Sequence, residues 1–394
     1  MKSKIKFLKI TYVHNWAYAN RDRREVAAAL DLGWDVTVLE PNDSENGDAS
    51  GYKFVGETTK PVKWKHFPKK INQLVAGVCW AKAAARLEPD IISGHNMLGV
   101  YIGLLSNRYR KDHKKAKVVY DAHEYLMGQL VNKSGIVKTV NGLLEKNVIK
   151  CADVSIFVND SIADAVQKDY KLKERPLVIR NVPLMAPEVS EEERISARLE
   201  LEQKFGDCGN KNFIIMYHGA IMSGRGLRVF IEAVKRMPDI CGVIIGYGTD
   251  SAIEELKRSL RESDARDRLA YHEAVPQKEL WEYIAAADAE MVTIQAINRS
   301  YYFSLPNKLL ESIQAGTPVI ASNFPEIEKM VNRYHIGLTC DPENLDEVCA
   351  CIEKLKNDPE FRKQCRANAV AVKEELSWET ESRKLRQALL QLAE

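Results

Sequence analysis

Strand-like and helix-like runs alternate along the whole chain, and this alternation restricts the available folds more than any other feature. Helix-like runs such as RDRREVAAALDLG in the first half and GLRVFIEAVKRM in the second separate the strand-like ones. Regular alternation of this kind favours parallel sheets covered by helices on both faces. The sequence therefore predicts two α/β domains, each a Rossmann-like, doubly wound parallel sheet. The predicted strands are IKFLKITYVH, WDVTVLEP, DIISGH, KVVYDAH, ADVSIFVN and LVIRNVP, then FIIMYHGA, CGVIIGYG, RLAYHEAV, AEMVTI and TPVIAS.

The two halves are separated by residues 181–212, where two prolines precede an acidic helical run. Prolines and a change in composition are typical of a domain boundary. We expect a first domain over 1–185, a linker over 186–209 and a second domain over 210–375.

The composition is that of a soluble globular protein, with 45% hydrophobic and 28% charged residues among 394. The opening MKSKIKFLKITYVH is too short and too often interrupted by lysine for a signal peptide, and no run approaches a membrane span. We expect a cytoplasmic protein whose eight cysteines stay reduced. Cys349 and Cys351 fall in a helical pattern and point apart, which suits a metal poorly.

Charge is distributed unevenly between the halves. Residues 1–185 hold 30 lysines and arginines against 20 acidic residues, a net +10, whereas the remainder holds 27 against 35, a net −8. Two basic runs with aromatic residues, 60–70 and 108–117, suit an anionic membrane surface or a lipid-diphosphate acceptor, and equally a solvated face. Nucleic acid is not expected, because neither run lies in a known nucleic-acid-binding fold.

Ligands of open parallel sheets bind beyond the carboxyl ends of the strands. In YHGAIMSGRGLRVF a predicted strand ends at Gly219, and Gly224, Arg225 and Gly226 precede a helix. Glycines allow close backbone approach, a helix N-terminus attracts anions, and arginine binds phosphate with two hydrogen bonds. The sequence indicates a phosphate site here or, as the alternative, a capped loop with a solvated arginine.

Two weaker signals follow the next strands. Gly246 and Gly248 form a glycine turn, but Ser251 breaks the dinucleotide-binding pattern. The loop around Val275 could offer main-chain groups to a nucleotide base, or could be a plain connection.

The stretch FSLPNKLLESIQAG predicts a helix with Ser304 as N-cap and Pro306 in its first turn. Lys308 and Glu311 are three residues apart on one face of that helix. A surface salt bridge is one interpretation, and it would contribute little to stability. Beside Arg225, the pair instead indicates a cation for phosphate and a carboxylate for paired hydroxyls.

At this point the motifs resemble a known family. Gly219-(five residues)-Arg225-Gly226, Pro-Asn-Lys-x-x-Glu-x-x-x-x-Gly-x-Pro-Val from residue 306, VVYDAHE at 118–124, CADVSIFVNDSIAD at 151–164 and IRNVP at 179–183 are similar to the retaining family-4 glycosyltransferases. The resemblance covers most of the chain. It implies the GT-B fold, with two facing domains and a last helix, 376–394, that packs back on the first.

The resemblance also implies roles for individual residues. Arg225 and Lys308 would hold the donor diphosphate, Glu311 the two ribose hydroxyls, and His123 the donor sugar from across a cleft. Without the resemblance, His123 reads as a strand-end histidine satisfied by Asp121 or Glu124. The remaining donor-side candidates are Gly219, Gly224, Gly246, Gly248, Val275, Ser304, Leu305 and Asn307.

The sequence departs from the family pattern at two positions. Phe303 stands where the family has the first glutamate of its Glu-(seven residues)-Glu motif, and Ala220 stands where an arginine often follows the strand glycine. The loop HNWAYANRDRRE also replaces a glycine-rich turn. We expect the acceptor site to draw on that loop and on the end of DIISGH, through His14, Asn15, Arg21 and His95. The alternative is that the loop only moves and binds no acceptor.

The implied reaction is retaining transfer of a hexosyl unit from a nucleotide-diphosphate sugar, expected to be a UDP-sugar, to a hydroxyl of a glycan or lipid-linked acceptor. It needs no metal or cofactor, since cations and helix N-termini can stabilise the leaving diphosphate. Polysaccharide synthesis at the inner face of the cytoplasmic membrane fits this reaction. The alternatives are a nucleotide-sugar 2-epimerase of the same fold and a non-catalytic subunit, the latter suggested by Phe303 and Ala220.

Overall fold

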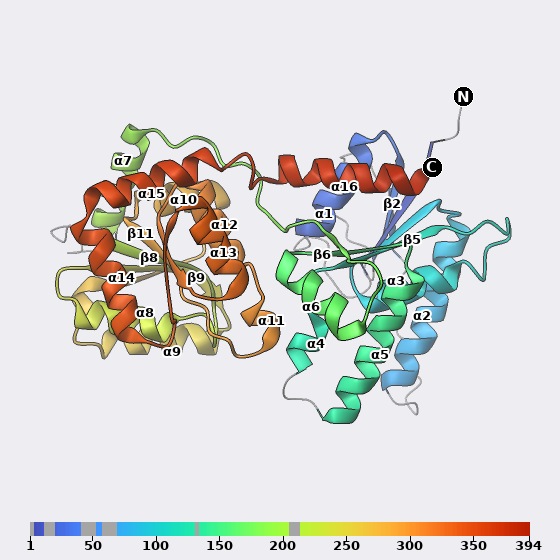
Figure 1. Ribbon diagram of the computed structural model, residues 1–394, viewed down its shortest axis with the longest axis horizontal. Coiled ribbons are helices and arrows are strands. Elements are labelled where there is room, and N and C mark those ends of the chain that lie inside the picture. The colour runs from blue at the N-terminus through green and yellow to red at the C-terminus, as the bar shows by residue number, and fades with distance from the viewer. Residues whose placement is uncertain (1–3, 12–19, 41–52, 57–68, 131–133, 205–212) are drawn as a thin grey trace. The chain divides into compact units, whose positions relative to one another are not determined.

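The computed structural model describes residues 4–11, 20–40, 53–56, 69–130, 134–204 and 213–394. The chain forms two compact units: unit 1 is Met1–Asn181 with Glu381–Glu394, and unit 2 is Val182–Thr380 (Figure 1). The segment expected to be a linker lies within unit 2. It contains helix α7 (Glu191–Lys204), whose Ala197 and Leu201 are buried in a hydrophobic cluster of that unit.

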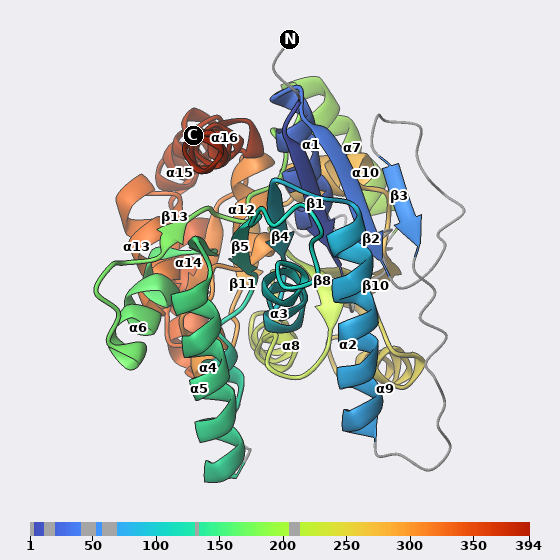
Figure 2. The same cartoon turned by 90° about the vertical axis from the view of Figure 1, so that its right-hand side faces the viewer.

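Unit 1 is built on a seven-stranded sheet in the order β3-β2-β1-β4-β5-β6-β7. Every neighbouring pair of strands is parallel. Helices α2, α3 and α5 lie side by side, with α3 in the middle (Figure 2). The strands are β1 (Lys6–Ile10), β2 (Asp35–Glu40), β3 (Lys53–Gly56), β4 (Ile91–Gly94), β5 (Lys117–Ala122), β6 (Val154–Phe157) and β7 (Leu177–Val178). The helices are α1 (Asn20–Asp31), α2 (Lys69–Arg86), α3 (Met97–Ser106), α4 (Leu126–Gln129), α5 (Gly135–Cys151) and α6 (Asp160–Tyr170).

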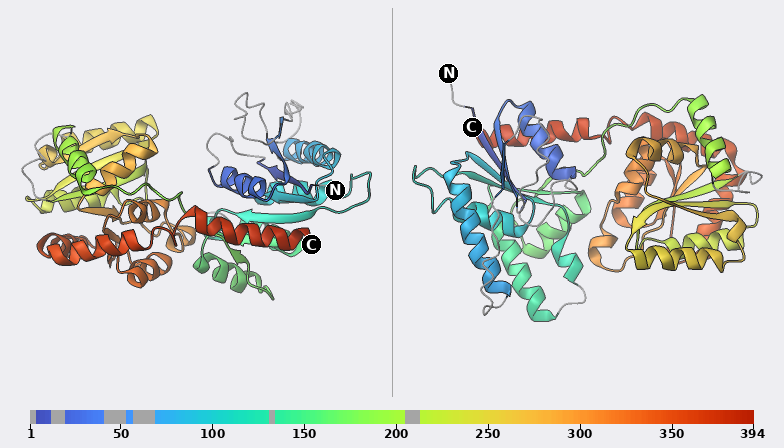
Figure 3. Two further views of the ribbon diagram at one scale, coloured as in Figure 1. Left: turned by 90° about the horizontal axis from the view of Figure 1, so that it is seen from above. Right: turned by 180° about the vertical axis from the view of Figure 1, so that it is seen from behind.

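Most of the last helix, α16 (Trp378–Ala393), belongs to unit 1 although it is distant in sequence. Its Leu385 and Leu389 are buried, and Arg386 Nη1 lies 2.9 Å from Asp31 Oδ2 of α1. Figure 3 shows α16, in red, beside the blue α1.

Unit 2 contains a six-stranded sheet in the order β10-β9-β8-β11-β12-β13, again parallel throughout. The doubly wound parallel sheets predicted from the sequence are therefore confirmed. The strands are β8 (Ile214–Ile221), β9 (Cys241–Gly248), β10 (Leu269–Glu273), β11 (Ala289–Val292), β12 (Val319–Ser322) and β13 (Gly337–Cys340). Besides α7, the helices are α8 (Leu227–Arg236), α9 (Asp250–Arg261), α10 (Gln277–Ala286), α11 (Arg299–Tyr302), α12 (Asn307–Gln314), α13 (Pro325–Tyr334), α14 (Leu345–Asn357) and α15 (Pro359–Ala371).

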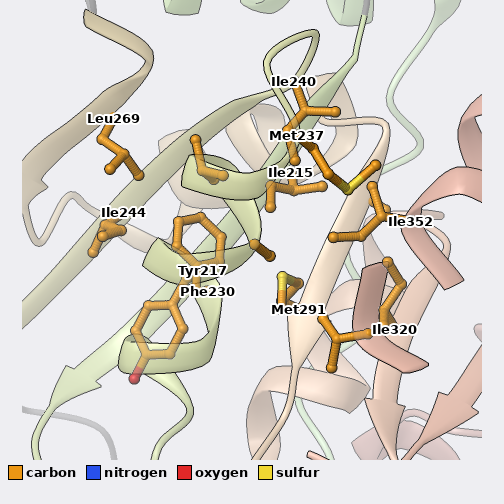
Figure 4. Close-up of a cluster of buried hydrophobic side chains, with 14 of the residues drawn as sticks. Ile215, Tyr217, Phe230, Met237, Ile240, Ile244, Leu269, Met291, Ile320 and Ile352 are labelled. Carbon is orange, nitrogen blue, oxygen red and sulfur yellow. The ribbon is translucent and has the colours of Figure 1, made fainter. Parts of the chain in front are cut away.

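A hydrophobic core between the sheet of unit 2 and its helices fixes β8 against α8. The rings of Tyr217 on β8 and Phe230 on α8 pack edge to face with centroids 6.3 Å apart. Ile215, Ile244 and Met291 from three neighbouring strands surround them (Figure 4). Because both ends of the β8–α8 loop are anchored in this core, the loop itself is held at the carboxyl end of the sheet.

Candidate functional site

The candidate site of unit 2 lies where the order of strand addition in its sheet reverses. After β8 the chain builds outward through β9 and β10, whereas β11, β12 and β13 extend on the other side of β8. The carboxyl ends of β8 and β11 therefore form a topological switch point, the usual ligand position in such sheets.

The loop between β8 and α8 approaches β11 so closely that it requires glycine. Gly226, with φ +81°, is the N-cap of α8, and a Cβ there would overlap the carbonyl oxygen of Thr293 just beyond β11. Gly224 also has a positive φ, +80°. Strand β8 continues to Ile221 rather than ending at Gly219 as predicted, although Gly219 already bends the backbone with φ +114°.

Two cations lie at this point without a hydrogen-bond acceptor among the described residues. The half-buried Arg225 leaves its buried Nε without a hydrogen bond, and its guanidinium carbon lies 5.0 Å from the ring centroid of Tyr301. Lys308 is buried, its Nζ makes no hydrogen bond, and it sits 3.0 Å from the ring centroid of Tyr217. Burial, together with the charge of Arg225, outweighs Glu290 and Glu311 and lowers the pKa of Lys308 to about 7. Two mutually repelling cations with unused donors make a site that fits an anion.

Glu311 takes part in a buried chain of charges that sequence reasoning missed. His218 Nε2 lies 2.9 Å from Glu311 Oε2, and His218 Nδ1 lies 3.0 Å from Glu290 Oε1. The backbone N–H of His218 donates to the same Glu290 oxygen at 3.0 Å. Burial lowers the pKa of His218, but the two carboxylates outweigh it and raise that pKa to about 9. The imidazolium thus holds Glu311 in place, and the alternative interpretation, a salt bridge between Lys308 and Glu311, does not appear among the ion pairs of the described residues.

The start of α12 differs from the prediction. The helix begins at Asn307 with Pro306 as its N-cap, and Ser304 is not the cap because its Oγ donates to the carbonyl of Tyr301 at 2.8 Å. Leu305 is half-buried, and Asn307 is exposed.

The weaker donor-side candidates have structural reasons of their own. Gly246 pairs with Gly219 across β8 and β9, and a Cβ at Gly246 would overlap the Gly219 carbonyl. Gly248 is exposed at the end of β9. Val275 packs its side chain against a hydrophobic cluster of unit 2.

In unit 1, Arg21 is occupied within the protein instead of being available to an acceptor as expected. Its Nε and Nη2 donate to both carboxylate oxygens of Asp121, and its Nη1 donates to the Ile179 carbonyl at 3.0 Å. Burial disfavours the charge of Asp121, but Arg21 outweighs it and holds the pKa of Asp121 well below its usual range. Residues 14 and 15, the other two loop candidates, lie outside the described residues.

His95 and His123 lie together beside a buried carboxylate. Their ring centroids are 4.6 Å apart, and Asp22 oxygens lie 3.5 Å from His95 Nδ1 and 3.6 Å from His123 Nε2. His123 Nε2 is also 3.1 Å from Asp121 Oδ2. His123 remains partly exposed, whereas His95 is buried. His123, which the resemblance assigned to the donor sugar, is therefore held by Asp121, as the interpretation without the resemblance predicted.

Lys9 and Glu25 complete this cluster, and sequence reasoning missed both of them and Asp22. Lys9 Nζ lies 2.9 Å from Asp22 Oδ1 and also pairs with Glu25. The ligand atoms of Asp22, His95 and His123 lie within 4.8 Å of one another, close enough to hold a metal ion. The ammonium of Lys9 already supplies a positive charge at Asp22. A lysine inside the apolar run KFLKI was the signal available in the sequence.

The two basic runs fare differently. Most of the run 60–70 lies outside the described residues. In the run 108–117, Arg110 is buried and paired with Asp112, whereas Arg108, Lys111, Lys114, Lys115 and Lys117 are exposed. Among the helices that the structure describes, none is both long and apolar enough to span a bilayer.

Two Rossmann-like units, with a last helix that returns to the first, define the GT-B class of glycosyltransferases. Comparison with known families agrees: residues 23–182 match the model of glycosyltransferase family 4, and residues 200–372 match that of glycosyl transferases group 1. The chain belongs to this group 1 glycosyltransferase family.

The known proteins that the chain resembles in sequence are distant relatives. It is 23% identical to the alpha-D-kanosaminyltransferase of Streptomyces kanamyceticus over 77% of this chain and 73% of that protein. It is 22% identical to an amylovoran biosynthesis glycosyltransferase of Erwinia amylovora over 84% and 86%. Anabaena HepE, solved in complex with UDP, has the same fold, with a TM-score of 0.77 and 16% identity over 99% of this chain and 100% of that one.

Proposed function

We propose that this glycosyltransferase moves a hexosyl unit from a UDP-sugar to a hydroxyl of a glycan or lipid-linked acceptor, with retention and without a metal. The observation that carries the proposal is the pair of unpartnered cationic groups, Arg225 Nε and Lys308 Nζ, at the switch point of unit 2. A diphosphate would satisfy both, and the solved UDP complex of HepE supports uracil as the base. The amylovoran relative supports a role in surface or capsular polysaccharide synthesis.

The energetic demand of the reaction is the charge that grows on the leaving diphosphate as the anomeric bond breaks. Donors fixed in place before the reaction meet that demand best, since they need not reorganise. Arg225 supplies a permanent charge, and Lys308, with a pKa of about 7 before binding, gains a proton as the anion arrives. The N-terminus of α8 adds backbone N–H groups beside Gly226.

Glu311 is suited to bind the ribose hydroxyls. Its Oε2 accepts from His218, which fixes the orientation of the carboxylate. We propose that His123 contacts the transferred sugar and that the His95 end of the unit 1 cluster serves the acceptor. An anionic membrane surface beside 108–117 would present a lipid-linked acceptor.

The test is slow hydrolysis of UDP-hexoses, because it needs no acceptor. The protein is incubated with UDP-glucose, UDP-galactose or UDP-N-acetylglucosamine in EDTA, and UDP release and the first sugar anomer are followed by NMR. We expect UDP release from one donor, the α-anomer appearing first, and no release by Lys308→Met. Release of the β-anomer first would refute retention, a C2-epimer without transfer would indicate the epimerase, and no release from any donor would refute the transferase.

A further inference from the structure

Helix α5 of unit 1 (Gly135–Cys151) turns its apolar residues toward solvent. Ile136 and Leu143 are 78% and 63% exposed, and Val137, Val140 and Leu144 are exposed as well. These positions follow the i, i+1, i+4, i+7, i+8 pattern of a single helical face. A surface helix normally buries such a face against its own core. In α5 that face stays exposed, and no described residue of unit 1 buries it.

The inner face of α5 explains why the helix cannot rotate to bury these residues. Glu145 points inward and is fully buried, where it accepts hydrogen bonds from Tyr120 Oη of β5, at 3.0 Å, and from Tyr170 Oη of α6. Burial raises the pKa of Glu145. Rotation of α5 would leave two buried hydroxyls and a carboxyl without hydrogen-bond partners, which strongly disfavours it. The outward apolar face is therefore fixed by the polar interior.

The charges on α5 favour one kind of partner. Apart from the buried Glu145, its charged residues are Lys138, Lys146 and Lys150, so every charge it can present is positive. Helix α3 packs beside α5 (Figure 2) and leads into the basic run 108–117, whose exposed lysines add to this charge. An apolar face flanked only by cations is typical of a helix that lies in an anionic lipid interface.

A second copy of the chain fits this face less well. A two-fold contact brings the same patch of both copies together, so the lysines of one α5 would meet those of the other. Lipid phosphates, by contrast, neutralise them.

We propose that α5 inserts its exposed apolar residues between the lipids of an anionic membrane, with Lys146 and Lys150 at the lipid phosphates. The proposed function explains only why the protein would bind a membrane, which is to bring unit 1 to a lipid-linked acceptor. The binding itself requires neither donor nor turnover.

The test is co-flotation of the full chain with vesicles of phosphatidylcholine alone or mixed with phosphatidylglycerol. We expect binding to the mixed vesicles only, weakened at least tenfold in the double variant Ile136→Ser, Leu143→Ser. The matched control is Ile195→Ser, Leu199→Ser on α7 of unit 2, two side chains of the same types that are 49% and 53% exposed. The control should bind vesicles as the unchanged protein does.

Further arms separate the alternatives. Lys146→Gln with Lys150→Gln should also weaken binding while leaving the melting temperature unchanged, so the proposal remains testable if the serine variant unfolds. UDP binding, measured on the same samples, should be equal in all variants; its absence from every sample would refute the donor site and not this proposal. Absence of vesicle binding, equal loss in the α7 control, or a dimer that the α5 variant converts to monomer would overturn the membrane proposal.

Discussion

Burial of Lys308 destabilises the folded state, and we propose that the residue is retained because it binds the donor anion. An amine taken out of water beside Arg225 loses its hydration, and its pKa falls from 10.5 to about 7. Because the folded-state pKa lies below the unfolded one, the folded state is penalised at neutral pH and below, and the penalty is relieved as pH rises toward 10.5. A bound diphosphate would remove the penalty by stabilising the charge.

The first prediction follows from that pKa. UDP binding at about pH 8 has to recharge Lys308, so we expect uptake of nearly one proton there and almost none at about pH 6. The affinity should accordingly fall by up to about tenfold per pH unit above pH 7. Titration calorimetry in buffers of different ionisation enthalpy measures both quantities.

Two variants check the assignment of that proton. Lys308→Met should abolish the uptake and raise the melting temperature at pH 7, because it removes a buried amine. Lys235→Met, which changes a lysine paired with Glu232 on α8 of the same unit, should change neither. Proton uptake that persists in Lys308→Met would show that another group titrates.

Candidate residues of the donor-side site could be found from the sequence where a local motif marks them. Arg225, Lys308 and Glu311 stood out because each lies near a glycine or proline that marks the start of a helix. His218 and Glu290 did not, because strand pairing brings together positions 72 residues apart. The acidic residue inside the buried strand AEMV was a signal that only the pairing of β8 with β11 explains.

At the scale of elements, the site depends on how closely the β8–α8 loop meets the end of β11. Gly226 combines a left-handed backbone with a Cβ position that the Thr293 carbonyl already fills. Any side chain there has to push the loop, and Arg225 with it, away from the switch point.

The second prediction separates these two costs. Gly226→Ala should lower the free energy of unfolding by more than about 2 kcal/mol and weaken UDP binding, through both strain and overlap. Gly33→Ala, at φ +74° with open space around the Cβ, should cost only the backbone strain of about 1–2 kcal/mol and leave UDP binding unchanged. Urea denaturation and calorimetry supply the numbers; equal costs for the two variants would mean that the contact with Thr293 is unimportant.

Most elements were predictable because buried parallel strands are continuous apolar runs. The strands that the sequence did not reveal, β3 and β13, are four residues each and lie at sheet edges. In β13 three of the four side chains are only half-buried, so pairing with β12 and not an apolar pattern makes it a strand. The buried cluster of Lys9, Asp22 and Glu25 was not predicted either, because the packing of β1 against α1 brings these residues together and no sequence motif connects them.

At the scale of the whole molecule, the two halves of the chain carry opposite net charges. The half that carries α5 and the basic runs is positive, whereas the half proposed to receive a diphosphate has a net charge of −8. Long-range attraction therefore does not explain donor binding. The local cations at the switch point have to supply it, which makes them the central claim of the account.

The measurement that tests this claim most directly is calorimetric titration of UDP into the full chain in EDTA, beside Arg225→Ala and its matched control Arg228→Ala. Arg228 is exposed in the first turn of α8, three residues after Arg225. We predict metal-independent binding at one site, about ten- to a hundredfold weaker in Arg225→Ala, as expected for a charge-assisted hydrogen bond, and unchanged in Arg228→Ala. Equal affinity of all three proteins for UDP, or no binding by any, would contradict the account.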